Sequence, residues 1–276
     1  MPEVVTSDGV RIAYTDRGRG RPLVLLHGWT FSGRFFDDVA APLAERFRVV
    51  TPDLRGHGES EDPGHGYRVA RLAADLRDLL DALDLRDAVV LGWSLGCAVV
   101  WQYLELFGTE RVGGVVYAAQ PPRQYIAVDW PWTHAECFDE AGAAALLARV
   151  TADPAAEDRR QLTAIRTTEP DDAERDRLLT EMGKCPVGAR VAVMTDHTRH
   201  DWRDLLPTLA VPTLVCVAEQ DKVFDPRGPA WVGEHVPGAR TERFPDAGHA
   251  FFLDEPEHFV AAVTGFAAPG AGGGGS

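Results

Sequence analysis

Short apolar runs that alternate with amphipathic segments restrict the fold of this chain more than any other feature. The runs at 22–26, 48–51, 88–91 and 114–117 have the length of buried strands and are too short for buried helices. Between 67 and 85, apolar residues recur with helical spacing, and Asp and Arg residues occupy the opposite face. Strands buried on both sides and separated by amphipathic helices predict an α/β fold, with a parallel sheet covered by helices on both faces.

The strand pattern also predicts how the chain divides into domains. It is present in residues 1–120, which open with an expected β-hairpin, and it returns in residues 207–268. Residues 121–206 contain several helical stretches and no apolar strand run. We therefore expect an α/β core in two parts, interrupted by a helical cap insertion. The Gly-rich residues 269–276 are expected to form a flexible tail outside the fold.

Composition argues against several classes of protein. The 276 residues include 28 Lys and Arg against 42 Asp and Glu, and the net charge of −14 disfavours nucleic acid and anionic membranes as partners. Four widely spaced cysteines (Cys97, Cys137, Cys185 and Cys216) indicate free thiols, not a zinc site or a disulfide framework. Because the sequence has no signal peptide and no apolar run of membrane-spanning length, it predicts a cytoplasmic protein. Its oligomeric state is left open.

Ser94 lies between two glycines in the otherwise apolar run 89–100. A buried hydroxyl needs a hydrogen-bond partner, so Ser94 is either part of a turn that ends a strand or a nucleophile on a sharp strand-to-helix turn. Gly92 and Gly96 favour the second interpretation, because so tight a turn leaves no room for side chains at these positions. The N-terminus of the following helix also favours developing negative charge. We predict that Ser94 is a catalytic nucleophile.

A serine nucleophile requires a base, and the base requires an acid that orients it. After a strand–turn–helix nucleophile, the expected chain order is Ser, Asp, His. Asp221 follows the apolar run 213–217, and His249 follows a further strand-like segment. Asp225 is a competing acid, but Asp221 is favoured because it lies nearer the end of its strand, where a rigid carboxylate is expected.

The oxyanion that forms during acyl transfer needs two fixed hydrogen-bond donors. The backbone N–H of Leu95, the residue after the nucleophile, is expected to be one of them. The backbone N–H of Trp29 is expected to be the other, since it follows the apolar run 23–26 in a loop where Gly28 permits close approach.

With these residues in view, the sequence closely resembles the α/β-hydrolase fold family over nearly its whole length. The stretches that carry the resemblance are Leu25–Trp29, Asp53–Ser60, Gly92–Gly96, Gln220-Asp221 with Pro226 after it, and Gly248-His249. The resemblance implies an eight-stranded, mostly parallel sheet with a helical cap, and a Ser94–His249–Asp221 triad. Within the family, the chain looks most like small serine esterases that include cofactor-free haloperoxidases. One departure is Ala218, where the family usually has glycine.

The substrate pocket is expected to draw on aromatic residues and on a histidine beside the oxyanion loop. Aromatic residues crowd the start of the predicted cap, where they suit either the core of the cap or the wall of an apolar pocket, and we favour the wall. Trp93 could either line the pocket or pack beneath it, and His27 is expected to fix the loop beside the oxyanion donors. The residues assigned to the pocket are His27, Trp93, Tyr125, Trp130, Trp132 and Phe138.

A metal site is the alternative interpretation of one polar stretch. His197 and His200 have helical i, i+3 spacing and are flanked by Asp196 and Asp201, which could hold a metal ion. No third group of ligands accompanies them, so we expect a polar junction between cap and core instead. The predicted chemistry requires neither a metal nor a cofactor.

These features together predict a serine hydrolase that acts on a small molecule through an acyl-enzyme on Ser94. The expected substrate is a small to medium carboxylic ester, lactone or thioester with a largely apolar acyl part. Two alternatives remain. The same triad can serve perhydrolysis, C–C bond cleavage or a cyclisation, or the protein can be a ligand-binding member of the fold whose turnover is incidental.

Overall fold

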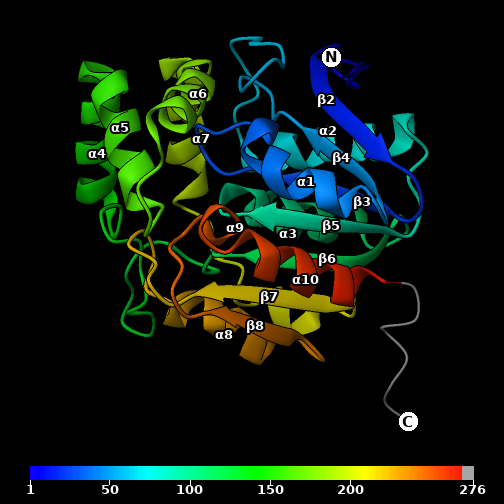
Figure 1. The fold of residues 1–276 in the computed structure, drawn as a ribbon. Coiled ribbons are helices and arrows are strands. Elements are labelled where there is room, and N and C mark those ends of the chain that lie inside the picture. The colour runs from blue at the N-terminus through cyan, green and yellow to red at the C-terminus, as the bar shows by residue number, and fades with distance from the viewer. Residues whose placement is uncertain (269–276) are drawn as a thin grey trace.

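The computed structural model describes residues 1–268, which form an eight-stranded sheet between layers of helices (Figure 1). The Gly-rich tail expected at 269–276 lies outside the described residues. The strand order is β1-β2-β4-β3-β5-β6-β7-β8. The strands are β1 (Glu3–Val5), β2 (Arg11–Gly18), β3 (Pro22–Leu26), β4 (Arg48–Pro52), β5 (Ala88–Trp93), β6 (Val112–Ala118), β7 (Thr213–Ala218) and β8 (Arg240–Phe244).

The register of the sheet confirms the predicted mostly parallel α/β architecture. The opening hairpin pairs β1 and β2, and β2 also runs antiparallel to β4, whereas every pairing from β4 to β8 is parallel. All six residues of β5 are buried, as expected for a central strand with both faces covered.

Two hydrophobic cores lie on opposite faces of the sheet because side chains alternate along each strand. Val24 and Leu26 join the core formed with α2 (Val69–Ala82) and α3 (Leu95–Phe107). Leu23 and Leu25 point the other way and join the core formed with the helices of the second layer. These helices are η1 (Gly33–Phe36), α1 (Asp37–Leu43), α9 (Phe251–Asp254) and α10 (Pro256–Ala267). A further helix, α8 (Arg227–His235), packs against β7.

Between β6 and β7, the chain forms four helices beyond the edge at which β5 and β7 end (Figure 1). They are α4 (Glu140–Ala152), α5 (Pro154–Ala164), α6 (Asp172–Gly183) and α7 (Val187–His197), followed by the short η2 (Leu206–Thr208). Asp139, Asp153 and Asp171 cap the first three, because each side chain accepts a hydrogen bond from a backbone N–H of the first turn. We refer to residues 121–206 as the inserted segment.

None of the helices in residues 1–268 combines the length and the apolar character needed to cross a membrane.

Candidate active site

Ser94 occupies a strained turn between β5 and α3. Its φ and ψ are 54° and −118°, a conformation that is costly for a residue with a side chain. A Cβ atom on Gly92 would lie 2.4 Å from the carbonyl carbon of Gly96, and one on Gly96 would lie 2.4 Å from the carbonyl oxygen of Leu26. Only glycine fits at either position, so these two residues permit the turn that presents Ser94.

Asp221 and His249 form a buried hydrogen-bonded pair. His249 Nδ1 lies 2.8 Å from Asp221 Oδ2, and the two side chains are 2% and 1% exposed. The other carboxylate oxygen, Oδ1, accepts hydrogen bonds from the backbone N–H groups of Val223 (2.7 Å) and Phe224 (3.1 Å). Because Asp221 offers only an acceptor to the ring, His249 donates from Nδ1 and keeps Nε2 free to accept a proton.

Asp225, the competing acid, is engaged elsewhere. Its carboxylate accepts hydrogen bonds from the backbone and the guanidinium of Arg227, at 2.5–3.0 Å. This neighbour lowers the pKa of Asp225. The structure therefore places Asp221, and not Asp225, on the histidine.

The loop expected to supply an oxyanion donor passes close to Ser94. A Cβ atom on Gly28 would lie 3.3 Å from Ser94 Cβ. The side chains of this loop are held by the inserted segment. The Trp29 indole donates to the carbonyl of Arg190 (2.9 Å), and the Thr30 hydroxyl donates to Gln161 Oε1 (2.8 Å). The donor positions expected at Trp29 and Leu95 thus lie on either side of Ser94, one in this loop and one at the start of α3.

His27 links the loop after β3 to a second loop that follows β4. Its Nε2 accepts a hydrogen bond from the backbone N–H of Leu54 (2.9 Å), so its Nδ1–H donates to the carbonyl of Gly28 (2.7 Å). Burial and the neighbouring His57 hold the pKa of His27 well below its usual value. The ring is therefore a neutral link between two loops.

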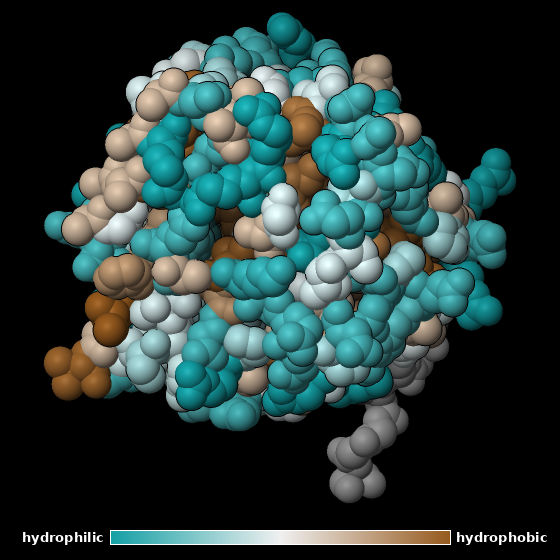
Figure 2. All heavy atoms as spheres, turned by 60° about the vertical axis from the view of Figure 1, so that its left-hand side comes forward, coloured by the Kyte–Doolittle hydropathy of each residue, from teal (hydrophilic) through white to brown (hydrophobic). Residues whose placement is uncertain are grey.

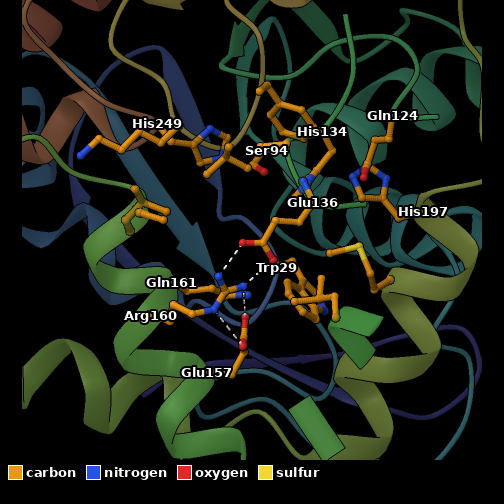
Figure 3. A pocket seen from close by; sticks show the side chains of 18 of the residues that line it. Trp29, Ser94, Gln124, His134, Glu136, Glu157, Arg160, Gln161, His197 and His249 are labelled. Carbon is orange, nitrogen blue, oxygen red and sulfur yellow. Dashed lines mark hydrogen bonds and ion pairs between the residues drawn. The ribbon is translucent and has the colours of Figure 1, made fainter. Parts of the chain in front are cut away.

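One cavity contains both Ser94 and His249, and it encloses about 690 Å³ including its open mouth. Figure 3 shows the two side chains at the same end of the cavity. The core supplies one side, termed the core wall, and the inserted segment supplies the other, termed the inserted wall. The core wall comprises Trp29, Phe31, Ser94, Lys222, Val223, Phe224 and His249. The inserted wall comprises Gln124, His134, Ala135, Glu136, Leu146, Glu157, Arg160, Gln161, Ala164, Ile165, Met194 and His197.

The predicted pocket lining is wrong, because none of its six residues borders this cavity: His27, Trp93, Tyr125, Trp130, Trp132 and Phe138. Trp93 is fully buried on the sheet face away from α3, where it stacks on Phe31 and its indole donates to the carbonyl of His249. Trp130 packs edge-on against Trp132 and Trp231. The early aromatic residues of the inserted segment mostly pack on one another or on the core, while Phe138 is 43% exposed.

Sequence reasoning missed most of the inserted wall. His134, Glu136 and Arg160 belong to no recognisable motif, so only the fold brings them to the cavity. His197, which the sequence places in a polar junction between cap and core, is buried at 3% exposure on the cavity wall. The polar stretch around it was the available signal.

The charged groups of the inserted wall neutralise one another. Arg160 donates to Glu136 Oε1 (2.6 Å) and to Glu157 Oε1 (3.1 Å) (Figure 3). Arg149 also contacts Glu136. The hydrogen bond from Arg160 and the charges of both guanidinium groups lower the pKa of Glu136. Figure 2, which brings the inserted helices forward, shows a largely hydrophilic face with apolar residues visible in its recesses.

The carboxylates around His197 and His200 are occupied by protein donors. Asp196 accepts from the backbone N–H of Val69 (2.8 Å) and lies 3.2 Å from His200, while Asp201 pairs with Arg123 and Arg203. Within the described residues, no group of three or more His, Cys, Asp or Glu side chains could hold a metal ion.

A serine on a strained strand-to-helix turn, a buried Asp–His pair and a helical insertion above the strand ends together define a class of protein. The family model for the alpha/beta hydrolase fold matches residues 21–256. The chain belongs to this family.

Its relatives include esterases and haloperoxidases. A pimeloyl-[acyl-carrier protein] methyl ester esterase from Nitrosomonas europaea is 32% identical over 88% of this chain and 94% of its own length. A non-heme chloroperoxidase from Kitasatospora aureofaciens is 40% identical over 44% of this chain, and the match spans 45% of that protein, less than half its length. Among solved structures, an esterase from Exiguobacterium antarcticum superposes with a TM-score of 0.91 at 25% identity, covering 96% of this chain and 98% of that one.

Proposed function

We propose that the protein is a serine hydrolase that cleaves a small to medium carboxylic ester, lactone or thioester. The observation that carries this proposal is the buried His249–Asp221 pair, which shares a cavity with a serine held in a strained turn. Strain at a turn of this kind is retained where function requires it. The names of the related esterases support the same chemistry.

In the proposed reaction, His249 Nε2 accepts the Ser94 proton as Oγ attacks the substrate carbonyl. The negative charge on the carbonyl oxygen is stabilised by the backbone N–H groups of Trp29 and Leu95. His249 then returns the proton to the leaving alcohol or thiol, and the acyl group stays on Ser94. Water repeats the sequence and releases the acid.

Asp221 is proposed to act through His249. Its bond to Nδ1 holds the ring in the tautomer that accepts at Nε2, and its charge stabilises the imidazolium that forms. Two backbone N–H groups fix the carboxylate itself, so the ring orientation is set by the acid loop.

The cavity supports a substrate with a largely apolar body. Apolar side chains from both walls border it: Phe31, Leu146, Ile165, Met194, Val223 and Phe224. Its extent suits a compact ester better than a polymer.

The proposal is tested by a fluorophosphonate, which reacts with activated serines, followed by peptide mass spectrometry. The label is expected on Ser94 in the wild type and is expected to be absent from His249→Ala, while the exposed-site control His65→Ala should be labelled normally. A screen of short acyl esters, lactones and thioesters then identifies the preferred bond. Label on any other residue would contradict the assignment.

A second candidate reaction is perhydrolysis, in which hydrogen peroxide replaces water as the acceptor of the acyl group. The match to a non-heme chloroperoxidase favours it, although it covers less than half of that relative. Product analysis with and without peroxide separates the peracid from the acid.

A further inference from the structure

Besides Gln161, which accepts a hydrogen bond from Thr30, the inserted wall carries three uncharged polar side chains that the proposed mechanism does not use. They are Gln124, His134 and His197, and all three face the cavity that contains Ser94 (Figure 3). The charged residues of this wall pair with one another, whereas buried polar atoms left without partners lower stability.

The hydrogen bonds of His134 fix which of its nitrogens carries the proton. Nδ1 accepts from the backbone N–H groups of Glu136 and Cys137, both at 3.0 Å. A neutral ring that accepts at Nδ1 carries its proton on Nε2. Nε2–H has no hydrogen-bond acceptor among residues 1–268, so His134 presents a free donor on the cavity wall.

The position of His134 relative to the proposed catalytic residues is also fixed. The backbone N–H of Ala135 donates to the carbonyl of Val223 (2.8 Å), which ties this segment to the acid loop. The His134 ring packs edge-on against Phe224, with centroids 5.0 Å apart, and the Phe224 ring lies 5.5 Å from that of His249. A donor held in this way has a set distance from the reacting carbonyl.

Gln124 adds an unused acceptor, Oε1, and His197 adds an unpaired ring nitrogen, Nδ1, which donates or accepts according to its tautomer. Both residues are at least 97% buried. Gln124 Oε1 and His197 Nδ1 are buried atoms without a hydrogen-bond partner in the described part of the chain. In Figure 3 both side chains lie at the same side of the cavity.

This part of the wall is electrically neutral. Burial and the charge of His249 lower the pKa of His134 to about 4, and burial with neighbouring His200 lowers that of His197 to about 3. Glu136 and Glu157 are paired with Arg160, and Lys222 is an exposed residue of the core wall. A charged ligand group would therefore meet no unpaired opposite charge at these three residues.

We propose that Gln124, His134 and His197 bind a neutral substrate group that has both a donor and an acceptor, an amide or a hydroxyl, near the scissile carbonyl. The inference rests on the proposed function and narrows its substrate class. An amide oxygen accepts from His134 Nε2–H, and the amide N–H donates to Gln124 Oε1. His134 and Gln124 are then specificity-determining residues.

The test uses two pairs of esters that differ only by an amide within a chain of equal length. The first pair is ethyl N-propionylglycinate and ethyl hexanoate, with the amide in the acyl part. The second pair is 2-(propionylamino)ethyl butanoate and hexyl butanoate, with the amide in the alcohol part. For each pair, kcat/KM of the amide ester is divided by that of the alkyl ester. Changes in this ratio from wild type to variant do not depend on the intrinsic reactivity of the esters.

In at least one pair, His134→Phe and Gln124→Leu should each lower the ratio by about tenfold, the cost of leaving a hydrogen-bonding group without its partner. His134→Gln, which keeps a hydrogen-bond donor at this position, should lower the ratio less than His134→Phe does. The exposed control His65→Phe should leave it unchanged. Equal losses of kcat/KM for both members of each pair would show a merely structural role and overturn the inference. A wild-type preference for monoethyl adipate, which carries a free charged carboxylate, over ethyl N-propionylglycinate would overturn it as well.

Binding to Ser94→Ala separates this inference from the proposed function. The amide ester of the preferred pair should bind Ser94→Ala about tenfold more tightly than its alkyl partner, and His134→Phe in that background should remove the difference. If fluorophosphonate does not label Ser94 and the wild type hydrolyses no ester, lactone or thioester, the proposed function fails and the binding comparison still decides the inference. Hydrolysis without any amide dependence in rate or binding refutes the inference alone.

Discussion

The two walls of the cavity differ in whether their hydrogen bonds are complete. Behind the core wall, Asp221 uses both carboxylate oxygens, and one of them orients His249. On the inserted wall, Gln124 Oε1 and His197 Nδ1 have no partner within residues 1–268. The difference teaches that the hydrogen bonds around His249 are formed before anything binds, whereas two polar atoms of the inserted wall are left for the bound group that we propose.

Removing the nucleophile should have the largest effect, because it disables the core wall and leaves the inserted wall intact. Ser94→Ala is expected to lower kcat by about 10⁴- to 10⁶-fold, to what binding and the oxyanion donors supply. Substrate affinity, measured directly, should change little. A variant that retains more than a hundredth of the wild-type rate would remove Ser94 from the mechanism.

Replacing Asp221 tests a residue that does not border the cavity and is proposed to act through His249. Asp221→Asn keeps the shape but removes the charge and favours the wrong tautomer of His249, and the comparable change in a serine protease costs about 10⁴-fold in kcat. Asp225→Asn should change the rate only modestly, because Asp225 pairs with Arg227. Steady-state kinetics of both variants decide the assignment, and the opposite pattern would move the acid four positions along the chain.

The free energy of unfolding should depend on pH, because buried histidines such as His57 stay neutral in the folded protein. Burial lowers the pKa of the fully buried His57 to about 4, whereas an unfolded histidine titrates near 6.5. The unfolded chain therefore binds more protons in this window, and the contribution of His57 is lost as pH falls from 6.5 towards 4.

Between pH 7 and pH 5, His57 alone should account for about 2 kcal/mol of lost unfolding free energy. Asp53 acts in the opposite direction, since burial raises its pKa to about 6. The measurement is therefore the difference between wild type and His57→Phe in urea denaturation at the two pH values. A pH dependence that His57→Phe leaves unchanged would contradict the neutral state of this ring.

The preference of the inserted wall for a neutral polar group should be almost insensitive to mild acid. The pKa values of His134 and His197 lie at about 4 and about 3, so neither ring gains a proton between pH 8 and pH 5.5. The ratio of kcat/KM for the amide ester to that for the alkyl ester should stay within about twofold, because protonation in the core wall affects both esters alike. A ratio that titrates above pH 6 would mean that one of these rings is charged in its working state.

Chelation should have the smallest effect. Neither wall requires a metal in the proposed reaction, so EDTA should leave the rate unchanged in an ester assay. A loss that zinc restores would point to the Asp196–Asp201 stretch as a metal site after all.

The proposed catalytic residues could be predicted from the sequence because each of them follows a strand of the parallel sheet. Ser94 and Asp221 follow the apolar strands β5 and β7, and His249 follows the more polar β8; strand ends of a parallel sheet meet at one edge. Local patterns therefore identified residues that the fold brings together.

The inserted wall could not be predicted in the same way. Trp93 is adjacent to the nucleophile in sequence, yet strand alternation turns its side chain to the other core. His134 is held at the cavity by a backbone hydrogen bond from Ala135 to Val223. Because these residues are far apart in the sequence, no local pattern in either segment predicts the contact. Which side chains of a helical insertion face inward depends on tertiary packing rather than on local spacing.

The attachment of the loop after β3 to the inserted segment has a consequence for exchanging specificity between members of the family. Trp29 and Thr30 are held by Arg190 and Gln161, and the Ser32 hydroxyl donates to Glu181. Three successive inserted helices (α5, α6 and α7) therefore anchor the loop that we propose to supply an oxyanion donor. A chimera that received another protein's helices would inherit a new pocket and lose these anchors. Such a graft would need to include the loop residues that bond to its helices. Exchanging the inserted helices alone should therefore change the reaction rate as well as the substrate specificity.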